Sequence, residues 1–352
     1  MSGKIAFAVP GKITNLTGGT IYDRRVMQEL TNQGFDVHHI ELPDSFPAPT
    51  DKNMDNAFAK LAQVPPGAPL IVDGLAFGAL DTDRLTQLPA ACIALVHHPL
   101  AEEHGLAENR RAFLHQNETN NLAFARHVLV TSLHTAELLS THYGVERQKI
   151  SVAVPGVERP KLAQAATKPP LILAVGIQLP RKGHDILLNA LSQIRDLEWN
   201  AIIVGAALDE CFAAELKELQ AQLGLSERVK LVGRLESDQV DRLYSQASIF
   251  ALATRYEGYG IVFNEALVRG LPIVSCATGA VVDTVPEGAG LLVQPEAPDA
   301  FADALRTMLT DHALRAACAA KAKSAGDLLP SWSDTAANIA VTLNTALEYE
   351  TG

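Results

Sequence analysis

The chain has 352 residues, which is more than one hydrophobic core usually holds, so we expect two domains. Its formal net charge of −11 at pH 7 argues against nucleic acid as the main partner. Hydrophobic residues make up 47% of the chain, yet no apolar run approaches the roughly 20 residues that a membrane span needs.

Short apolar runs alternate with segments of helical period through the first half. The N-terminal run "KIAFAV" is too short for a signal peptide and predicts a first strand. Further strands are predicted at "FDVHHIEL", "PLIVDG", "CIALVHH", "HVLVTS" and "ISVAVPG", and helices at "IYDRRVMQELTNQG" and "NNLAFARH". Scattered cysteines in apolar contexts favour a reduced, cytoplasmic protein without disulfides or a zinc site: Cys92, Cys211, Cys276 and Cys318.

The pattern weakens across residues 157–170, "VERPKLAQAATKPP", a polar and proline-containing stretch typical of a linker. It restarts with strands at "LILAVG", "NAIIVG", "VKLVG", "SIFALAT", "PIVSC" and "GLLVQP", with helices between them and two helices at the C-terminus. We therefore place a first domain at 1–158, a linker at 159–170, a second domain at 171–330 and a final helical segment at 331–352.

Strands that alternate with helices indicate parallel sheets covered by helices on both faces. Two such segments predict an α/β protein with two Rossmann-like domains that face each other across a cleft. Ligands of open parallel sheets bind at the carboxyl ends of the strands, so the strand-to-helix turns are where function is expected.

The turn after "SIFALAT" is rich in candidate binding groups. Its sequence, "RYEGYGIVFNEALVRGLP", places Glu257 before a glycine turn and Glu265 within the helix that follows. Gly258 and Gly260, with Tyr259 between them, allow tight backbone geometry and the close approach of a ligand to the main chain.

The N–H groups of Gly260, Ile261 and Val262 open this helix and predict a phosphate site. Glu257 lies on the loop, where a polar group beyond the phosphates would meet it, and Glu265 could accept hydrogen bonds from a diol such as a ribose. A plain helix start with two solvated glutamates is the alternative, and it is the commoner meaning of this spacing alone.

A cationic turn follows the first strand of the same domain. The segment "VGIQLPRKGHDILL" places Arg181, Lys182 and Gly183 just before a helix, at the same edge of the sheet. Two cations there could neutralise a leaving diphosphate through charge-assisted hydrogen bonds. In isolation the same three residues would more often face solvent.

These pieces make the second half resemble the nucleotide-binding domain of the retaining GT-B glycosyltransferases, family 4 of glycosyl transferases, also called group 1. The matching pieces are "LAVG…RKGHDILLNAL", "AIIVG", "RVKLVGRL", "DRLYSQASIFALATRYEGYGIVFNEALVRGLPIVS", "GLLVQP" and "FADALRTMLTD". The resemblance implies that Glu257 approaches the donor sugar, Glu265 the ribose hydroxyls and residues 260–262 the phosphates.

The resemblance also implies that Lys182, with Arg181 beside it, counters the diphosphate, and that the backbone around Val232 and Gly233 lies near the base. One position departs from the family, which usually has an arginine where this chain has Ile177. The usual pair of cations is thus incomplete unless Arg181 replaces the missing one. Thr254 stands where the family commonly has a serine.

The first half resembles the family more loosely. Its "TNLTGGTIYDRRVMQELTNQGFDVHHIEL" is similar to the family's N-terminal Gly-Gly loop, helix and strand, which implies that Gly18 and Gly19 approach the donor phosphates. In "CIALVHHPLAEEHG", His97 aligns with a family histidine that contacts the donor sugar, and a hydrogen-bonded structural histidine is the alternative. Ser132, at another strand end, is a weaker candidate.

The segment "PSWSDTAANIAVTLNTALEY" resembles the family's last helix, which crosses back onto the first domain, with Trp332 expected to pack. Neither half carries the GxGxxG or GxxxxGK[ST] pattern of dinucleotide oxidoreductases and P-loop enzymes. Metal-ligand residue types cluster after the fourth strand, but their spacing matches no known site and the family works without a metal, so we expect none. They are His97, His98, Glu102, Glu103 and His104.

The sequence therefore predicts retaining, metal-independent transfer of a sugar from a UDP-, GDP- or ADP-sugar to an acceptor hydroxyl, in polysaccharide or glycolipid synthesis. No cofactor is expected, and carbohydrate, lipid-linked and small-molecule acceptors stay open, as does contact with the inner face of a membrane. Three alternatives are weighed: a glycosidase that uses Glu257 and Glu265 as its pair, an epimerase or phosphorylase on the same fold, and a non-catalytic sugar-nucleotide binder.

Overall fold

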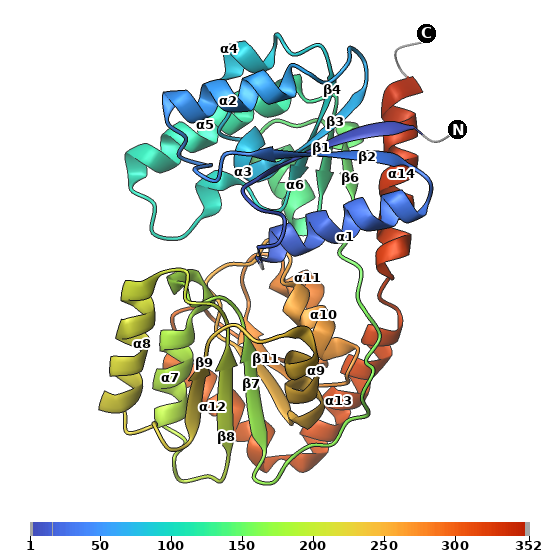
Figure 1. Cartoon of the computed structure of the whole chain (residues 1–352). Helices are drawn as coiled ribbons and strands as arrows, with labels where there is room; N and C mark the ends of the chain where they lie inside the picture. Colours follow the sequence, from blue (N-terminus) through green and yellow to red (C-terminus); the bar gives the residue numbers. More distant parts are fainter. Residues whose placement is uncertain (1–2, 16, 349–352) are drawn as a thin grey trace. The chain divides into compact units, whose positions relative to one another are not determined.

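The computed structural model describes residues 3–15 and 17–348, and the chain divides into two compact units. The first unit comprises the residues up to Gly156 together with those from Pro330, and the second runs from Val157 to Leu329. Figure 1 shows a sheet flanked by helices in each unit. The segment for which we predicted a linker belongs to the second unit, where the N–H groups of Ala165 and Thr167 donate to the carbonyl oxygens of Ser245 and Gln246.

The first unit is built on a six-stranded parallel sheet in the order β2-β1-β3-β4-β5-β6. Its strands are β1 (Lys4–Pro10), β2 (Asp36–Leu42), β3 (Pro69–Asp73), β4 (Ala91–Val96), β5 (His127–Val130) and β6 (Ile150–Val152). Its helices are α1 (Gly18–Asn32), α2 (Asp51–Leu61), α3 (Gly74–Phe77), α4 (Thr82–Leu85), α5 (Glu108–Phe124), α6 (Leu133–His142) and α14 (Trp332–Glu348). Every residue of β3 and β4 is buried, as expected for central strands of a parallel sheet covered on both faces.

Helix α14 packs against α1 within the first unit, and the two helices lie side by side in Figure 1. The Trp332 ring meets the Tyr22 ring edge to face at 5.8 Å, and the Thr335 hydroxyl donates to the Val154 carbonyl oxygen. Trp332 is therefore a packing residue, and the end of the chain completes the unit in which the chain begins.

The second unit has the same architecture, with a parallel sheet in the order β12-β11-β10-β7-β8-β9. Its strands are β7 (Leu171–Val175), β8 (Asn200–Val204), β9 (Val229–Val232), β10 (Ile249–Leu252), β11 (Ile273–Cys276) and β12 (Gly290–Val293). Its helices are α7 (His184–Ser192), α8 (Glu210–Gln222), α9 (Ser237–Gln246), α10 (Ile261–Leu267), α11 (Val281–Thr284), α12 (Pro298–Thr310) and α13 (His312–Asp327). Two parallel sheets with helices confirm the predicted fold class.

Two sequence predictions need correction. In the described part of the chain three helices, not two, follow β12, because α12 ends at Thr310 and Asp311 caps a separate helix by accepting a hydrogen bond from the Leu314 N–H. Cys211 is exposed, whereas the other three cysteines are buried as their apolar surroundings indicate. Among the described residues, no helix has the length and apolar character that crossing a membrane requires.

Candidate functional site

The glycine turn of the second unit leads from β10 into α10, as the sequence predicts. Gly260 has a φ of 85° and is the N-cap of α10, and a Cβ there would come within 2.6 Å of the Phe263 ring. Only glycine adopts this conformation here without strain. Asn264 donates to the Tyr259 hydroxyl at 2.8 Å, and the Thr284 hydroxyl donates to the Tyr259 carbonyl oxygen at 2.9 Å, so the turn is held from both sides.

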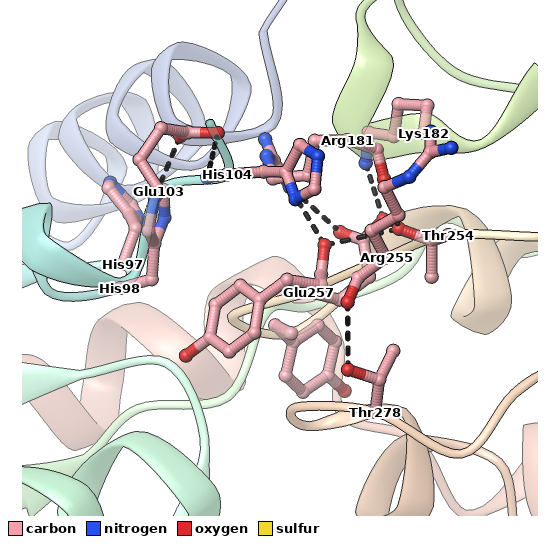
Figure 2. A network of polar contacts seen from close by, with 12 residues as sticks. His97, His98, Glu103, His104, Arg181, Lys182, Thr254, Arg255, Glu257 and Thr278 are labelled. Carbon is pink, nitrogen blue, oxygen red and sulfur yellow. Dashed lines mark hydrogen bonds and ion pairs between the residues drawn. The ribbon is translucent and has the colours of Figure 1, made fainter. Parts of the chain in front are cut away.

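Glu257 precedes this turn and is buried, with 4% of its surface exposed. Its Oε1 accepts hydrogen bonds from the Lys182 Nζ at 2.6 Å and the Thr254 hydroxyl at 3.0 Å, and its Oε2 lies 3.7 Å from an Arg181 nitrogen (Figure 2). Burial alone would raise the pKa of Glu257, but the charges of Lys182 and Arg181 lower it below its ordinary value. Glu257 is therefore an ionised carboxylate between two cations.

The cations reach Glu257 because two loops are joined through their backbones. Lys182 ends a short 3-10 helix (η3, Pro180–Lys182), and Gly183 follows with a φ of 62°. A Cβ at Gly183 would collide with the Ala253 carbonyl oxygen, so only glycine lets this loop pack against the end of β10. The Arg255 N–H donates to the Arg181 carbonyl oxygen at 2.8 Å, and Arg181 donates to the Tyr256 carbonyl oxygen at 3.1 Å.

Arg255 is a residue of this network that sequence reasoning missed. Its guanidinium donates to both carboxylate oxygens of Asp185, at 2.8 and 3.0 Å, and to Glu296. The Thr278 hydroxyl donates to the Arg255 carbonyl oxygen (Figure 2). Hydrogen bonds to Asp185 above all raise the pKa of Arg255. The position of Arg255 directly after a predicted strand could have marked it as a site candidate. Its partners could not be predicted, because Asp185 and Glu296 lie 70 and 41 residues away in the sequence.

Glu265 lies on α10 and is half-buried, not on an open face. Its Oε2 accepts a hydrogen bond from the Tyr244 hydroxyl at 2.8 Å, and the Arg269 guanidinium stacks over the Tyr244 ring at 4.6 Å. Burial raises the pKa of Glu265, and Tyr244 and Arg269 counter part of that effect. Tyr244 was not predicted, and it fixes the direction of this carboxylate.

Val232 ends β9, and Gly233 follows it with open space where a side chain would be, since a Cβ there meets nothing within 4 Å. Val232 also lines a pocket of about 360 Å³ together with Ile202, Leu235, Gln239, Arg242, Leu243 and Gln246. This pocket includes neither Glu257 nor the glycine turn. The buried ion pairs of Glu257 are the stronger indication of a functional site, because charged groups with perturbed pKa values cluster at such sites.

In the first unit, Gly18 and Gly19 open α1. Thr17 caps the helix, and its hydroxyl and that of Thr20 form a reciprocal capping box. A Cβ at Gly19 would lie 3.2 Å from the His97 ring, whereas Gly18 has open space. The structure therefore places Gly19 against the His97 ring.

His97 follows β4, and its Nε2 lies 3.1 Å from Asp23 Oδ1 and 3.4 Å from Asp73 Oδ2. Asp23 and Asp73 were not predicted, although Asp73 stands at the end of a strand, where a candidate was to be sought. Asp23 lies on the buried face of α1, and only the tertiary structure reveals its neighbours.

The remaining candidates have structural partners. His98 contacts Glu103 at 3.2 Å, so it does not join His97, and Ser132 caps α6 by accepting from the Thr135 N–H. Asp23, Asp73 and His97 form a group of three side chains, within the described residues, whose ligand atoms lie close enough together to hold a metal ion. The 3.1 and 3.4 Å separations suit a proton shared with the imidazole, and we interpret the group as hydrogen-bonded.

Residues 158–325 match the family model described as "Glycosyl transferases group 1". Over 202 residues the chain is 31% identical to a GDP-mannose-dependent monoacylated alpha-(1-6)-phosphatidylinositol monomannoside mannosyltransferase of Corynebacterium glutamicum, covering 54% of this chain and 51% of that one. Over 229 residues it is 28% identical to a D-inositol 3-phosphate glycosyltransferase of Xylanimonas cellulosilytica, covering 60% and 54%. The chain thus spans about half the length of these curated relatives.

Solved structures resemble the whole chain in fold. A sucrose-phosphate synthase from Thermosynechococcus elongatus superposes with a TM-score of 0.81 at 21% identity, covering 99% of this chain and 100% of that one. Anabaena HepE, solved in complex with UDP-glucose, superposes with a TM-score of 0.78 at 18% identity, covering 97% and 99%. These likenesses establish the same two-domain α/β fold.

Proposed function

We propose that this chain, whose residues 158–325 match the model of the group 1 glycosyl transferases, transfers a sugar from a nucleotide diphosphate sugar to an acceptor hydroxyl, with retention of configuration. The observation that carries the proposal is the buried Glu257 carboxylate, ion-paired with Lys182 and Arg181 directly beside the glycine turn that opens α10. Cations and helix N–H groups at one point suit a diphosphate.

In this proposal each part of the second unit binds one part of the donor. The first N–H groups of α10, at Ile261 and Val262, have no acceptor inside the helix and bind phosphate oxygens. Lys182 and Arg181 form ion pairs with Glu257 and, in the proposed complex, also with the diphosphate. Glu265 binds the ribose hydroxyls, and the open space at Gly233 accommodates the base.

The transfer step places negative charge on the leaving diphosphate. The bond from the anomeric carbon to the phosphate oxygen breaks, the acceptor oxygen bonds to that carbon on the same face, and a phosphate oxygen takes the acceptor's proton. Lys182, Arg181 and the helix N–H groups stabilise the charge that develops, and such preorganised groups are each worth about 10²- to 10³-fold in rate. Two protein cations at the diphosphate underlie our proposal that no metal is needed.

Glu257 orients both cations and contacts the sugar in this scheme. We propose that His97, Gly18 and Gly19 of the first unit also contribute to substrate binding, because Gly19 and the His97 ring are packed together. Two relatives are named for inositol phosphate and for a phosphatidylinositol mannoside, and these names support an acceptor of that class. A polyol phosphate or its lipid-linked form, met at a membrane surface, is therefore the first acceptor to try.

The test is turnover with defined donors. The protein is incubated with UDP-glucose, GDP-mannose or ADP-glucose and inositol 3-phosphate, and the released nucleoside diphosphate and the anomeric configuration of the product are measured. We expect one donor to be consumed and an α-linked product, with Lys182→Met at least 10²-fold slower. Lys217, which is exposed on α8, gives the matched control Lys217→Met with unchanged rate.

The alternatives give different results in the same assay. Donor bound but never consumed with any acceptor indicates a sugar-nucleotide binder, and phosphate-dependent cleavage indicates a phosphorylase. An inverted product contradicts retention. A glycosidase that uses Glu257 and Glu265 has no role for the cations, and in the structure these carboxylates have separate partners in Lys182 and Tyr244.

A further inference from the structure

His97 is held by two buried carboxylates that come from different elements. Asp23, from α1, has none of its surface exposed, and Asp73, at the end of β3, has 3% exposed. Both approach the same atom of His97, the Nε2, at 3.1 and 3.4 Å. When Asp23 and Asp73 are ionised, their oxygen atoms only accept hydrogen bonds and hold a proton on Nε2. Two negative charges within 3.4 Å of the ring also favour the imidazolium over the neutral imidazole.

Each part of this group is fixed by its own contacts. The second oxygen of Asp73 accepts the Leu75 N–H at 2.9 Å, which makes Asp73 the N-cap of α3. The Tyr22 ring meets the His97 ring edge to face at 5.2 Å, and the absence of a side chain at Gly19 leaves room for the imidazole. The ring therefore has one orientation, set before any ligand arrives.

We propose that Asp23 and Asp73 are positioning residues that keep His97 as an imidazolium and turn its Nδ1–H toward a hydroxyl or phosphate oxygen of the substrate. This inference rests on the proposed function for its substrate. It assigns His97 as a hydrogen-bond donor and excludes it as the base that deprotonates the acceptor. Among the described residues, Nδ1 has no hydrogen-bond partner, so its proton is available to a ligand.

The electrostatics of the group agree with this assignment. Burial lowers the pKa of His97, but the charge and hydrogen bond of Asp23, and then those of Asp73, raise it to about 10. Burial raises the pKa of Asp23 to about 7, with His97 opposing the shift and Asp73 adding to it. Among the described residues, the Tyr22 ring also contacts the imidazole and the Thr131 hydroxyl donates to the His97 carbonyl oxygen, and both side chains are uncharged at neutral pH.

The experiment measures the protonation of His97 directly in the full chain. The protein is labelled with ¹⁵N-histidine and treated with EDTA, the His97 ring is assigned with His97→Gln, and the ring nitrogens are followed by NMR from pH 6 to 10. We expect both nitrogens of His97 to be protonated at pH 8. Asp73→Asn is expected to weaken proton binding at His97 at least tenfold, which lowers its apparent pKa by one unit or more.

Asp81→Asn is the matched control, because Asp81 caps the four-residue helix α4 as Asp73 caps α3 but belongs to no contact of His97. It is expected to leave the His97 titration unchanged. Asp23→Asn gives an independent second variant if Asp73→Asn does not fold. A neutral His97 at pH 7, or a titration that neither variant moves, overturns the proposal.

Two further measurements distinguish this inference from a metal site at His97 and from the proposed donor site of the second unit. If adding Zn²⁺ to the EDTA-treated protein displaces the Nε2 proton at stoichiometric concentration, the group is a metal site and the proposal is wrong. Calorimetry with UDP, GDP and ADP on the same samples tests the donor site of the second unit separately. Failure of the nucleotides to bind contradicts the proposed function, whereas the NMR titration alone decides the state of His97.

Discussion

The charges at Glu257 illustrate what a sequence can and cannot reveal about single residues. Both the glutamate and the RKG turn are predicted to lie at the same sheet edge, and within the second unit they do. The ion pair between Glu257 and Lys182 was not predicted, because it depends on how Gly183 packs against Ala253. Asp23, Asp73, Tyr244 and Arg255 escaped notice for the same reason, since buried partners distant in sequence leave no local pattern.

Removing the Lys182 charge should destabilise the second unit. In Lys182→Met the buried Glu257 loses its closest cation, and breaking a buried pair in this way costs about 3–5 kcal/mol. We expect a lower midpoint for thermal unfolding of that unit in differential scanning calorimetry at pH 7. Lys217→Met is the control and should unfold like the wild type.

The size of this effect should depend on pH with a definite sign. Because the pKa of Glu257 is lowered on folding, its stabilisation is complete above the ordinary value of 4.5 and is lost as pH falls through the lower folded value. The difference between wild type and Lys182→Met should therefore be largest near pH 7 and shrink below pH 4.5. A difference that grows in acid would contradict the ion pair.

Glu265→Gln should weaken nucleotide binding several-fold without loss of the fold, because the amide accepts fewer hydrogen bonds from ribose hydroxyls. Tyr244→Phe should give a smaller loss, since it removes the hydrogen bond that directs Glu265 but keeps the ring under Arg269. Calorimetric titration measures both. Unchanged affinity in Glu265→Gln would refute the ribose assignment.

Turns are the elements on which the site depends, and glycines decide their geometry. Gly183→Ala and Gly224→Ala both place alanine at a nearly identical left-handed φ, 62° and 65°, which costs about 1–2 kcal/mol in each case. At Gly183 the new methyl also collides with the Ala253 carbonyl oxygen, whereas at Gly224 its nearest neighbour is the flexible Arg195 side chain at 3.4 Å. Only Gly183→Ala should displace Lys182 and lower transfer activity.

The matched pair is read out by thermal unfolding and by turnover. Equal activity in the two variants would mean that the RKG loop does not depend on its contact with β10. Sequence reasoning placed both strand-to-helix turns correctly, since glycine and strand patterns are local. It could not say which glycine tolerates a side chain, because that depends on the opposing backbone.

Over the whole molecule, the alternation of strands and helices was enough to predict two parallel sheets. Helix α13 was missed because only an aspartate cap separates it from α12, without the glycine or proline that marks other helix ends. The chain returns to the first unit through α14, whose buried residues include Trp332, Ile339 and Leu343.

Deleting residues 330–352 should therefore destabilise the first unit and spare the second. The deletion uncovers α1, including the side of Tyr22 that contacts Trp332. Differential scanning calorimetry should show a lower first-unit transition, while the second-unit transition in the same trace serves as the control. Equal shifts in both transitions would contradict the assignment of α14 to the first unit alone.

The donor site that we propose in the second unit binds a nucleoside diphosphate at Lys182, α10 and Glu265. Calorimetric titration of the EDTA-treated full chain with UDP, GDP and ADP tests it most directly, with Glu265→Gln in parallel. We predict that one nucleotide binds with a dissociation constant on the order of 1 μM, about −8 kcal/mol, and that Glu265→Gln binds it several-fold more weakly. Binding of none of the three would contradict the claim and show that the chain lacks the donor site.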